Sequence, residues 1–484
     1  MILANAWLVT MDDAASEHER GWLRIEDGRI AALGPGDPPA GAAGPPAPPP
    51  APPPTPPPWV GTGPPASRQD RRTDSEVDAT RPPRQNGESL LDLRGAVVTP
   101  GLVNTHHHLY QTLTRAHAQQ ADLFGWLRAL YPIWARIDAE MQYAAARTGL
   151  AELALSGCST VFDHHYVFPR GVTGLLEAEL AAARELGLRF VASRGSMDLG
   201  VSDGGLPPDE LAEDLDAILA DTERVAALAD GDLVQIAVAP CSPFSVTTRL
   251  MQESAELARR LGLRLHTHLA ETLEEEQYCR ELYGCTPVEY LERLGWLADD
   301  AWCAHCVHVS DAEAVRFAAA GVGVAHCPTS NLRLGAGIAP VRPLLDAGAR
   351  IGLGADGSAS NERSDLFLEV KQALLVARAR GGPGALTARE ALRLATRGGA
   401  DVLGRDDIGS LEPGKRADLA VWRTDGLELA GADDLVAGLV LSAPHRVDRL
   451  FVGGQERVRD GRLVDADEEE IAREHRIQAA RLVP

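Results

Sequence analysis

Short apolar runs alternate with longer amphipathic stretches between residues 99 and 403. The runs have the length and the branched or aromatic side chains of buried strands, and the stretches between them repeat apolar residues at helical spacing. Strands are predicted over residues 102–106, 159–164, 189–193, 234–239, 264–268, 301–305, 323–326 and 350–355. This alternation predicts a (β/α)8 TIM barrel. An open doubly wound sheet fits less well, because no Gly-x-Gly-x-x-Gly follows the first strand.

The two ends of the chain have a different pattern from the middle. Residues 1–34 and 417–464 show short apolar alternation, interrupted by turn signals such as Asp27-Gly28 and Gly453-Gly454. We therefore expect a small β-sandwich domain assembled from both chain ends, with the barrel inserted between them. The predicted domain bounds are 1–98 for the N-terminal part of the small domain, 99–403 for the barrel, and 404–484 for the C-terminal part with a closing helix.

Residues 36–88 interrupt the N-terminal part of the small domain. This segment holds more than half of the chain's 33 prolines, and residues 67–88 are polar. Such a composition forms locally extended polyproline II but cannot bury a core. We interpret residues 36–88 as a disordered proline-rich insertion in a surface loop. A proline-rich ligand for a partner domain is the alternative interpretation.

The chain of 484 residues has a net charge of −22 at pH 7. A field of that sign repels nucleic-acid phosphates and anionic membrane surfaces, so the expected partner is a small molecule rather than a nucleic acid or a membrane. No window approaches the roughly 18 apolar residues of a membrane span, and the first residues lack the pattern of a secretion signal. The seven cysteines have no disulfide-scaffold spacing, so a cytoplasmic protein with reduced thiols is expected.

Candidate chemistry first appears at the end of the first barrel strand, where residues 97–111 read VVTPGLVNTHHHLYQ. Side chains alternate between the two faces of a strand, so His106 and His108 are expected on one face and His107 on the other. Two imidazoles at the end of a buried strand can begin a metal site. A His-x-His pair is a weak signal by itself, so the hypothesis depends on ligands from later strands.

Later strands end in residues that complete such a site, because the catalytic groups of a barrel lie where its strands end. The fifth strand has His266 and His268 on one face, and His268 is the predicted ligand because it lies nearer the strand end. Glu271 lies just past that strand, His305 ends the sixth strand, and Asp356 follows the eighth. The predicted metal ligands are His106, His108, His268 and Asp356.

Imidazole and carboxylate ligands suit one divalent metal, which we predict to be zinc, with iron(II) as the alternative. Such a metal activates water for attack on an sp² carbon at neutral pH. Three predicted catalytic residues transfer protons or polarise the substrate. Asp356 is expected to take a proton from the water, Glu271 to carry a proton to a ring nitrogen of the substrate, and His305 to polarise the reacting centre. The predicted reaction is a hydrolysis that releases ammonia.

The chain resembles the amidohydrolase superfamily over nearly its whole length. The motifs that support this are PGLVNTHHH, HTHLAET, AHCVH, AHCPTSNLRLG, GLGADGSASN and SLEPGKRADLAVW. Within the superfamily, the chain is similar to the chlorohydrolase/aminohydrolase branch, which deaminates purines, pyrimidines and triazines. The segments HHHLYQTLTR, ELALSGCSTVFDHHYVFP, SDGGLPPD and APCSPFSV are similar to those of the 8-oxoguanine deaminase family. The resemblance implies replacement of the exocyclic amino group of 8-oxoguanine by oxygen, giving urate and ammonia, and it implies a homo-oligomer.

Two departures from the adenosine and S-adenosylhomocysteine deaminases of this branch bear on the substrate. Those enzymes have a glutamate before a Trp-Leu pair, where this chain has Gly125 before Trp126, and a histidine where this chain has Cys241. Because the glutamate is a natural partner for ribose hydroxyls, its replacement favours a free base over a nucleoside. Two further residues are expected to meet the base, Gln111 at an amide edge and Arg194 at a carbonyl oxygen. The predicted substrate-binding residues are Gln111, Arg194, Cys241 and Trp126, with His164 as a further candidate.

Three alternative functions stay open at this point. An s-triazine aminohydrolase that acts on a hydroxyatrazine-type ring would need a similar cavity, and so would a guanine or cytosine deaminase. From a different class, some proteins with the amidohydrolase fold are non-catalytic scaffolds. Scaffolds of that kind lose metal ligands, whereas all four predicted ligands are present in this chain.

Overall fold

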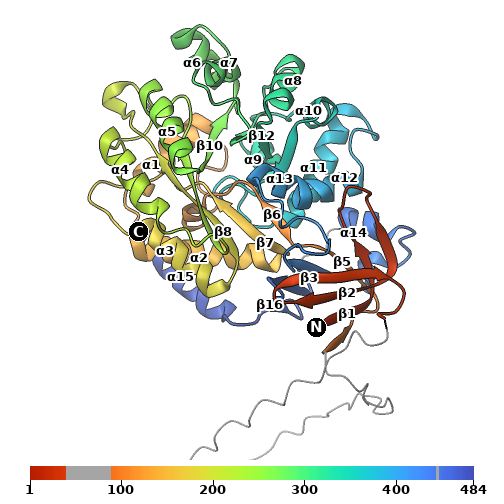
Figure 1. The fold of residues 1–484 in the computed structure, drawn as a ribbon. Coiled ribbons are helices and arrows are strands. Elements are labelled where there is room, and N and C mark those ends of the chain that lie inside the picture. The colour runs from red at the N-terminus through yellow and green to blue at the C-terminus, as the bar shows by residue number, and fades with distance from the viewer. Residues whose placement is uncertain (40–88, 443–445, 484) are drawn as a thin grey trace, which may run out of the picture.

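The computed structural model describes residues 1–39, 89–442 and 446–483. Its larger part is a closed barrel of parallel strands inside a layer of helices (Figure 1). The eight barrel strands are β6 (Leu102–Asn104), β7 (Cys158–Asp163), β8 (Arg189–Ser196), β9 (Val234–Pro240), β10 (Arg264–Leu269), β11 (Ala301–His305), β12 (Gly323–His326) and β13 (Arg350–Leu353). Parallel pairing of β13 with β6 closes the barrel. The predicted TIM barrel is confirmed.

Helices fill the connections between the barrel strands and continue past the last strand. The first connection holds the short helix η1 (Leu109–Thr114), α1 (Leu123–Trp134) and α2 (Ala139–Leu155). The remaining helices are α3 (Leu175–Leu186), η2 (Val201–Asp203), α4 (Leu215–Ala226), α5 (Thr248–Leu261), α6 (Leu273–Tyr283), α7 (Pro287–Arg293), α8 (Asp311–Ala320), α9 (Pro328–Arg333), α10 (Val341–Ala347), α11 (Leu366–Gly381), α12 (Ala388–Arg393), η3 (Leu394–Gly398), α13 (Gly399–Leu403), η4 (Leu427–Leu429), α14 (Leu435–Ser442) and α15 (Glu468–Leu482).

Burial explains the apolar runs from which the barrel strands were predicted. Every residue of β7 and β8 is buried, as expected for parallel strands that are covered on both faces. Inside the barrel, the rings of Phe162 and Trp302 meet edge to face with centroids 4.8 Å apart. Local signals set the helix ends. For example, the Thr247 side chain caps the start of α5, and Gly262 ends it in the left-handed conformation at φ 68°.

Two barrel strands are shorter than predicted. The strand β6 ends at Asn104, and β13 ends at Leu353. Past these ends, the two segments are joined by bonds outside the regular ladder. The Oδ1 atom of Asn104 accepts from the N–H of Ala355 at 2.8 Å, and the carbonyl of His106 accepts from the N–H of Asp356 at 3.0 Å. The histidine run and Asp356 therefore lie in loops at the mouth of the barrel rather than on strands.

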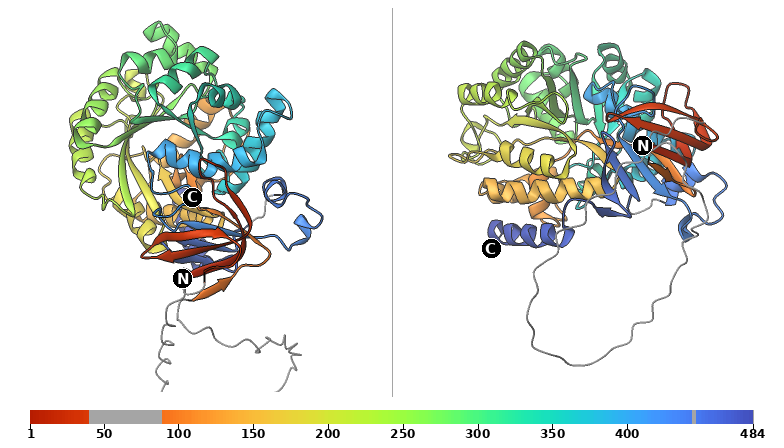
Figure 2. Two further views of the ribbon diagram at one scale, coloured as in Figure 1. Left: turned by 45° about the vertical axis from the view of Figure 1, so that its right-hand side comes forward. Right: turned by 60° about the horizontal axis from the view of Figure 1, so that its bottom comes forward.

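Both chain ends contribute to a second sheet beside the barrel, and the red and blue strands lie side by side in Figures 1 and 2. Its order is β17-β16-β15-β14-β5-β1-β2-β3, with β4 paired to β1. The predicted assembly of a small β-domain from both chain ends is confirmed, and its strands form one continuous nine-stranded sheet because β14 pairs with β5. The strands are β1 (Ile2–Val9), β2 (Glu17–Glu26), β3 (Arg29–Pro35), β4 (Leu90–Asp92), β5 (Ala96–Pro100), β14 (Leu419–Arg423), β15 (Arg449–Val452), β16 (Gln455–Arg459) and β17 (Arg462–Leu463).

The proline-rich insertion predicted over residues 36–88 lies outside the described residues, apart from residues 36–39. In the parts of the chain that the structure describes, no helix is both long enough and apolar enough to span a membrane.

Candidate active site and metal centre

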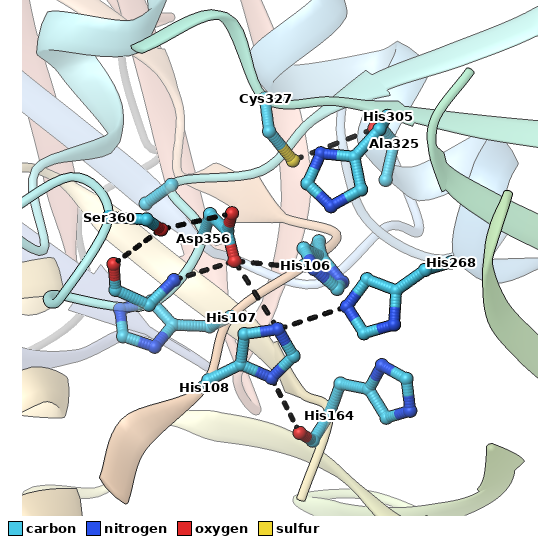
Figure 3. A network of polar contacts seen from close by, with 12 residues as sticks. His106, His107, His108, His164, His268, His305, Ala325, Cys327, Asp356 and Ser360 are labelled. Atoms are coloured by element: carbon cyan, nitrogen blue, oxygen red, sulfur yellow. Dashed lines mark hydrogen bonds and ion pairs between the residues drawn. The ribbon is translucent and has the colours of Figure 1, made fainter. Parts of the chain in front are cut away.

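The four predicted metal ligands meet at the mouth of the barrel. His106 and His108 come from the loop after β6, His268 from β10, and Asp356 from the loop after β13. All four side chains are buried. Figure 3 shows the three imidazole rings grouped with the carboxylate of Asp356. The middle histidine of the run, His107, lies outside this group.

The hydrogen bonds of two rings leave their Nε2 atoms facing each other. Nδ1 of His108 lies 2.7 Å from the carbonyl oxygen of His164, and Nδ1 of His268 lies 2.7 Å from that of Cys241. A carbonyl oxygen only accepts, so both Nδ1 atoms carry hydrogen and both Nε2 atoms carry a lone pair. These Nε2 atoms are 3.1 Å apart. Burial holds the pKa of both imidazoles well below the ordinary value, so a bound cation, rather than an extra proton, suits the space between them.

His106 is oriented in the same way by a ring below it. Nδ1 of His266 lies 3.1 Å from the carbonyl oxygen of Trp302 and therefore donates. The Nε2 atom of His266 is then free to accept from Nδ1 of His106, at 2.9 Å. Nε2 of His106 is left with a lone pair, is buried, and has no hydrogen-bond partner among the described residues. It lies 3.4 Å from Oδ1 of Asp356.

Asp356 supplies an ionised carboxylate to this group. Its Oδ1 atom lies 3.4 Å and 3.3 Å from Nε2 of His106 and His108. The N–H of Gly357 donates to Oδ1 at 2.7 Å, and the Ser360 hydroxyl donates to Oδ2 at 3.2 Å. Burial opposes ionisation, but the neighbouring imidazoles, His106 first among them, outweigh it and the pKa of Asp356 lies well below its ordinary value. The backbone of Asp356 is left-handed at φ 60°, a strained conformation that turns the side chain toward the histidines.

Three imidazole lone pairs and one carboxylate therefore converge on one point. The donor atoms of His106, His108 and His268, together with one from His164, all lie within 4.8 Å of one another. Neutral imidazole nitrogens and carboxylate oxygens are ligands that zinc and iron(II) accept. The buried lone pair of His106 and the close Nε2 pair of His108 and His268 both gain a partner when a cation binds. The residues present fit a divalent metal.

Glu271 and His305 form a second pair beside the ligands. Oε2 of Glu271 lies 3.6 Å from Nε2 of His305, and Nδ1 of His305 lies 2.9 Å from Oδ1 of Asn331. Burial raises the pKa of Glu271 to about 7. Burial lowers the pKa of His305, but the charges of Glu271 and Asp356 outweigh that effect and the net shift is upward. A carboxyl group with a near-neutral pKa beside an imidazole can take up and release a proton during a reaction.

A small cavity lies over these groups, and it contains three of the four predicted substrate-binding residues: Gln111, Cys241 and Trp126. The indole N–H of Trp126 donates to the Ala359 carbonyl at 3.0 Å, so its ring serves as an apolar wall. Two polar atoms of the cavity residues, Oε1 of Gln111 and the Tyr131 hydroxyl, are buried and have no hydrogen-bond partner among the described residues. A ligand edge that carries N–H groups would satisfy them.

The position of Gln111 depends on the absence of a side chain at Gly357. A Cβ atom at Gly357 would lie 1.9 Å from Oε1 and 2.3 Å from Cδ of Gln111. We expect Gly357→Ala to displace this amide and to lower kcat/KM by about 10- to 100-fold, mainly through KM. Steady-state kinetics of ammonia release would measure the change. Gly384→Ala is the matched control, because a Cβ there meets no atom of the described residues within 4 Å. An unchanged KM in Gly357→Ala would contradict a role for Gln111 in binding.

Arg194 does not reach the cavity, and the prediction that it meets a substrate carbonyl is wrong. Its guanidinium pairs with Glu213 and with Asp221, at 2.7 Å and 2.6 Å, and lies 3.7 Å from the centroid of the Phe168 ring. Side chains alternate along β8, and Arg194 is on the face that packs against the outer helices, where Asp221 belongs to α4. The sequence could not show this direction, because both faces of β8 are buried.

Three residues with evident roles at the site were not assigned to it from the sequence. His266 orients His106, Asn331 orients His305, and Ser360 contacts Asp356. His164, a further substrate-binding candidate from the sequence, offers a fourth imidazole nitrogen near the proposed metal ligands. His266 and His164 follow the pattern of histidines near strand ends, which was a usable signal. Asn331 and Ser360 had no such signal, because they come from helix α9 and a loop whose position depends on the fold.

The chain belongs to the amidohydrolase family. Residues 97–457 match the profile of that family. Over 421 residues, the chain is 48% identical to 8-oxoguanine deaminase from Pseudomonas aeruginosa, an alignment that covers 86% of this chain and 94% of the relative. It is 40% identical over 416 residues to isoxanthopterin deaminase from an unknown prokaryotic organism, covering 81% of this chain and 86% of the relative.

Comparison with a solved structure also places the fold of this chain in the amidohydrolase family. Atrazine chlorohydrolase TrzN from Arthrobacter aurescens TC1, complexed with zinc, aligns over 100% of both chains with a TM-score of 0.84 and 32% sequence identity. The predicted enzyme class is confirmed: the protein is a hydrolase that acts on carbon–nitrogen bonds.

Proposed function

We propose that the protein is a zinc-dependent deaminase that converts 8-oxoguanine to urate and ammonia. The observation that carries this proposal is a set of metal ligands beneath a cavity in which Gln111 Oε1 and the Tyr131 hydroxyl lack partners among the described residues. A flat heterocyclic base suits such a cavity, because apolar walls cover its faces and a few polar atoms fix its edges. The similarity to 8-oxoguanine deaminase supports the choice of base. The zinc complex of TrzN supports the choice of metal.

The residues of the site account for the proton transfers of this reaction. Water adds to the carbon that bears the amino group, a ring nitrogen gains a proton, and loss of ammonia leaves a carbonyl. A divalent metal held by the four proposed ligands would supply Lewis-acid activation of that water. Asp356 is ionised, accepts the first proton of the water and passes it to the departing amino group. Glu271 protonates the ring nitrogen and regains a proton from the added hydroxyl as the carbonyl forms, while His305 presents Nε2 to the reacting centre.

Glu271→Gln is expected to lower kcat by about 100-fold or more, because an amide cannot transfer a proton. Since the pKa of Glu271 is about 7, its proton-donating form predominates below that pH and is lost above it. The kcat/KM of the wild type should therefore fall on the alkaline side of pH 7, and this limb should be absent from the residual activity of the variant. Glu274→Gln, at an exposed position nearby, is the control. A fall on the acid side instead would mean that Glu271 acts in its ionised form.

The cavity must widen to admit the base. It measures about 30 Å³, whereas small-molecule sites usually measure about 300–1,000 Å³. Its apolar wall includes Leu123, Trp126 and Leu127 of α1, with Phe244 from the loop after β9. Because α1 belongs to the connection between β6 and β7 and not to the barrel itself, its side chains are the ones we expect to move apart when the base binds.

The proposal is tested by offering the zinc-loaded enzyme six compounds and measuring the amine released: ammonia from 8-oxoguanine, guanine, isoguanine, cytosine and isoxanthopterin, and ethylamine from hydroxyatrazine. A strong preference for 8-oxoguanine, with urate appearing at its own absorbance, is the expected result. Activity on isoxanthopterin or another base alone would support the proposed deamination but refute 8-oxoguanine as the substrate. No activity on any compound, with metal bound, would refute the proposed use of the cavity.

A triazine aminohydrolase is the second candidate. The observation in its favour is the similarity to TrzN over the whole chain and to hydroxydechloroatrazine ethylaminohydrolase of Pseudomonas sp., 36% identical over 407 residues. A hydroxylated triazine is also a flat ring with N–H groups, so the same cavity atoms would suit it. Turnover of hydroxyatrazine without turnover of 8-oxoguanine would favour this candidate.

A further inference from the structure

The end of β7 holds the loop that bears the metal-binding histidines. The carboxylate oxygen Oδ1 of Asp163 accepts from the N–H of Leu109 at 2.6 Å. The next residue, His164, donates its N–H to the carbonyl of His107 at 2.7 Å. Its own carbonyl accepts from Nδ1 of His108 at 2.7 Å. Asp163 and His164 thus hold three consecutive residues of the loop, His107, His108 and Leu109.

Of these bonds, the one made by Asp163 supplies a hydrogen-bond acceptor for the first N–H of a helix that has no side-chain cap of its own. The first N–H groups of a helix have no partner within the helix. The helix η1 begins at Leu109, and the residue before it, His108, makes no side-chain cap. Asp163 provides the missing acceptor from a different strand. Because η1 also contains Gln111, the same bond helps to place both a metal ligand and a residue of the substrate cavity.

The other oxygen of Asp163 belongs to a buried polar cluster behind the loop. Gln142 of α2 donates to Oε1 of Glu179 of α3 at 2.5 Å, and Nδ1 of His165 lies 2.9 Å from the same oxygen. Donor atoms of Asp163, His165 and Glu179 lie within 4.8 Å of one another. None of these side chains is exposed. Oδ2 of Asp163 and Oε2 of Glu179 have no hydrogen-bond partner among the described residues.

Two carboxyl groups in one dry site cannot both be ionised without a large cost. Burial, followed by the charge of Glu179, raises the pKa of Asp163 well above its ordinary value, and burial raises the pKa of Glu179 to about 8. One proton between the two groups supplies the donor that the unpartnered oxygens need. The N–H of Leu109 holds one oxygen of Asp163, and a hydrogen bond through the shared proton would join Asp163 to Glu179.

We propose that Asp163 is a positioning residue of the metal centre, which sets the place of His108 by holding the N–H of Leu109. Through the shared proton, Glu179 of α3 and its partner Gln142 of α2 would connect Asp163 to the outer helices. This inference rests on the proposed metal site. A second bound cation in the cluster of Asp163, His165 and Glu179 is the competing explanation, and the experiment separates the two.

The experiment measures zinc affinity, zinc stoichiometry and the thermal midpoint of full-length variants after removal of metal. Asp163→Ala is expected to weaken zinc binding by about 10- to 100-fold, the usual effect of losing a residue that orients a ligand. Asp163→Asn keeps an oxygen for the N–H of Leu109 and gains an amide N–H for Glu179, so its affinity should stay within about threefold of wild type.

Asp198→Ala is the matched control. Asp198 also holds a backbone N–H at the start of a helix in another element, since its Oδ1 accepts from the N–H of Thr247, the residue before α5, at 2.7 Å. Thr247 is not next to any proposed metal ligand in the sequence, whereas Leu109 directly follows His108. Asp198→Ala should therefore lower the thermal midpoint but keep the zinc affinity of the wild type.

Wild-type affinity in Asp163→Ala would overturn the inference. A zinc affinity of Asp163→Asn well outside about threefold of the wild type would also overturn it, because the carboxyl group rather than the hydrogen bond would then be required. This test compares Asp163→Asn with the wild type only, so it holds even if Asp163→Ala does not fold. If the wild type binds two zinc equivalents and the Asp163 variants lose one of them, the inference would be overturned in favour of a second cation bound by Asp163, His165 and Glu179. A wild type that binds no zinc would refute the proposed function itself, a result distinct from all the others.

Discussion

Replacing Asp356 with asparagine is expected to lower kcat for ammonia release by about 10³-fold or more. The amide has the shape of the carboxylate and keeps an oxygen for the N–H of Gly357, which lies 2.7 Å from Oδ1. It has no charge, however, and it cannot accept the proton that the attacking water gives up. The native group is ready for that role, because the neighbouring imidazoles, His106 first among them, outweigh burial and hold its pKa well below the ordinary value.

Ammonia release and bound zinc should both be measured in the Asp356→Asn variant. Ser360→Ala is the matched control, since it removes the hydroxyl 3.2 Å from Oδ2 and leaves the carboxylate in place. We expect it to reduce kcat by less than about tenfold, because the N–H of Gly357 still donates to the carboxylate. Full activity of Asp356→Asn would refute its role as proton acceptor. Loss of zinc together with activity would mean that its main role is as a ligand.

Removing the metal with a chelator is expected to abolish ammonia release and to lower the free energy of unfolding. Without a cation, the Nε2 atoms of His108 and His268 remain 3.1 Å apart with lone pairs facing, and the buried Nε2 of His106 has no hydrogen-bond partner in the part of the chain that the structure describes. Metal at about 100 times its Kd would contribute about 2.7 kcal/mol to stability by mass action. The thermal midpoint and ammonia release should be followed before chelation, after it, and after zinc is returned.

The histidine run itself contains a control for this prediction. His107 lies between two proposed ligands, but its Nε2 contacts the Ser364 hydroxyl at 2.9 Å and not the metal group. His108→Gln should therefore lose zinc, whereas His107→Gln should keep about one equivalent. Unchanged activity and an unchanged thermal midpoint after complete chelation would contradict a metal centre at this position.

The sequence by itself determined the barrel and the residue types at its mouth. A strand that is buried on both faces needs an apolar run, and a helix on the outside needs apolar residues at helical spacing, so both left a direct signal. Helix ends were also predictable where caps occur, as at Thr247 and Gly262 around α5. Because the strands of a barrel end at the same rim, His268 and Asp356 could be expected at one site although they are distant in the sequence.

The tertiary structure decided which way side chains point where the pattern has no preferred face. Both faces of β8 are buried, so nothing in its sequence showed that Arg194 points to the outer helices. The separation of His107 from His108 was predicted from strand alternation, yet these residues lie in a loop, and bonds to Ser364 and His164 orient them.

Contacts between distant segments were beyond the reach of sequence patterns for the same physical reason. The bond from Asp163 to Leu109, the free Oε1 atom of Gln111 over Gly357, and the pairing of β5 with β14 each depend on where separate elements pack. Local periodicity records whether a residue is buried, and it does not record its partner. The sequence therefore determined the elements and the chemical groups available to this protein, and packing decided which of those groups meet.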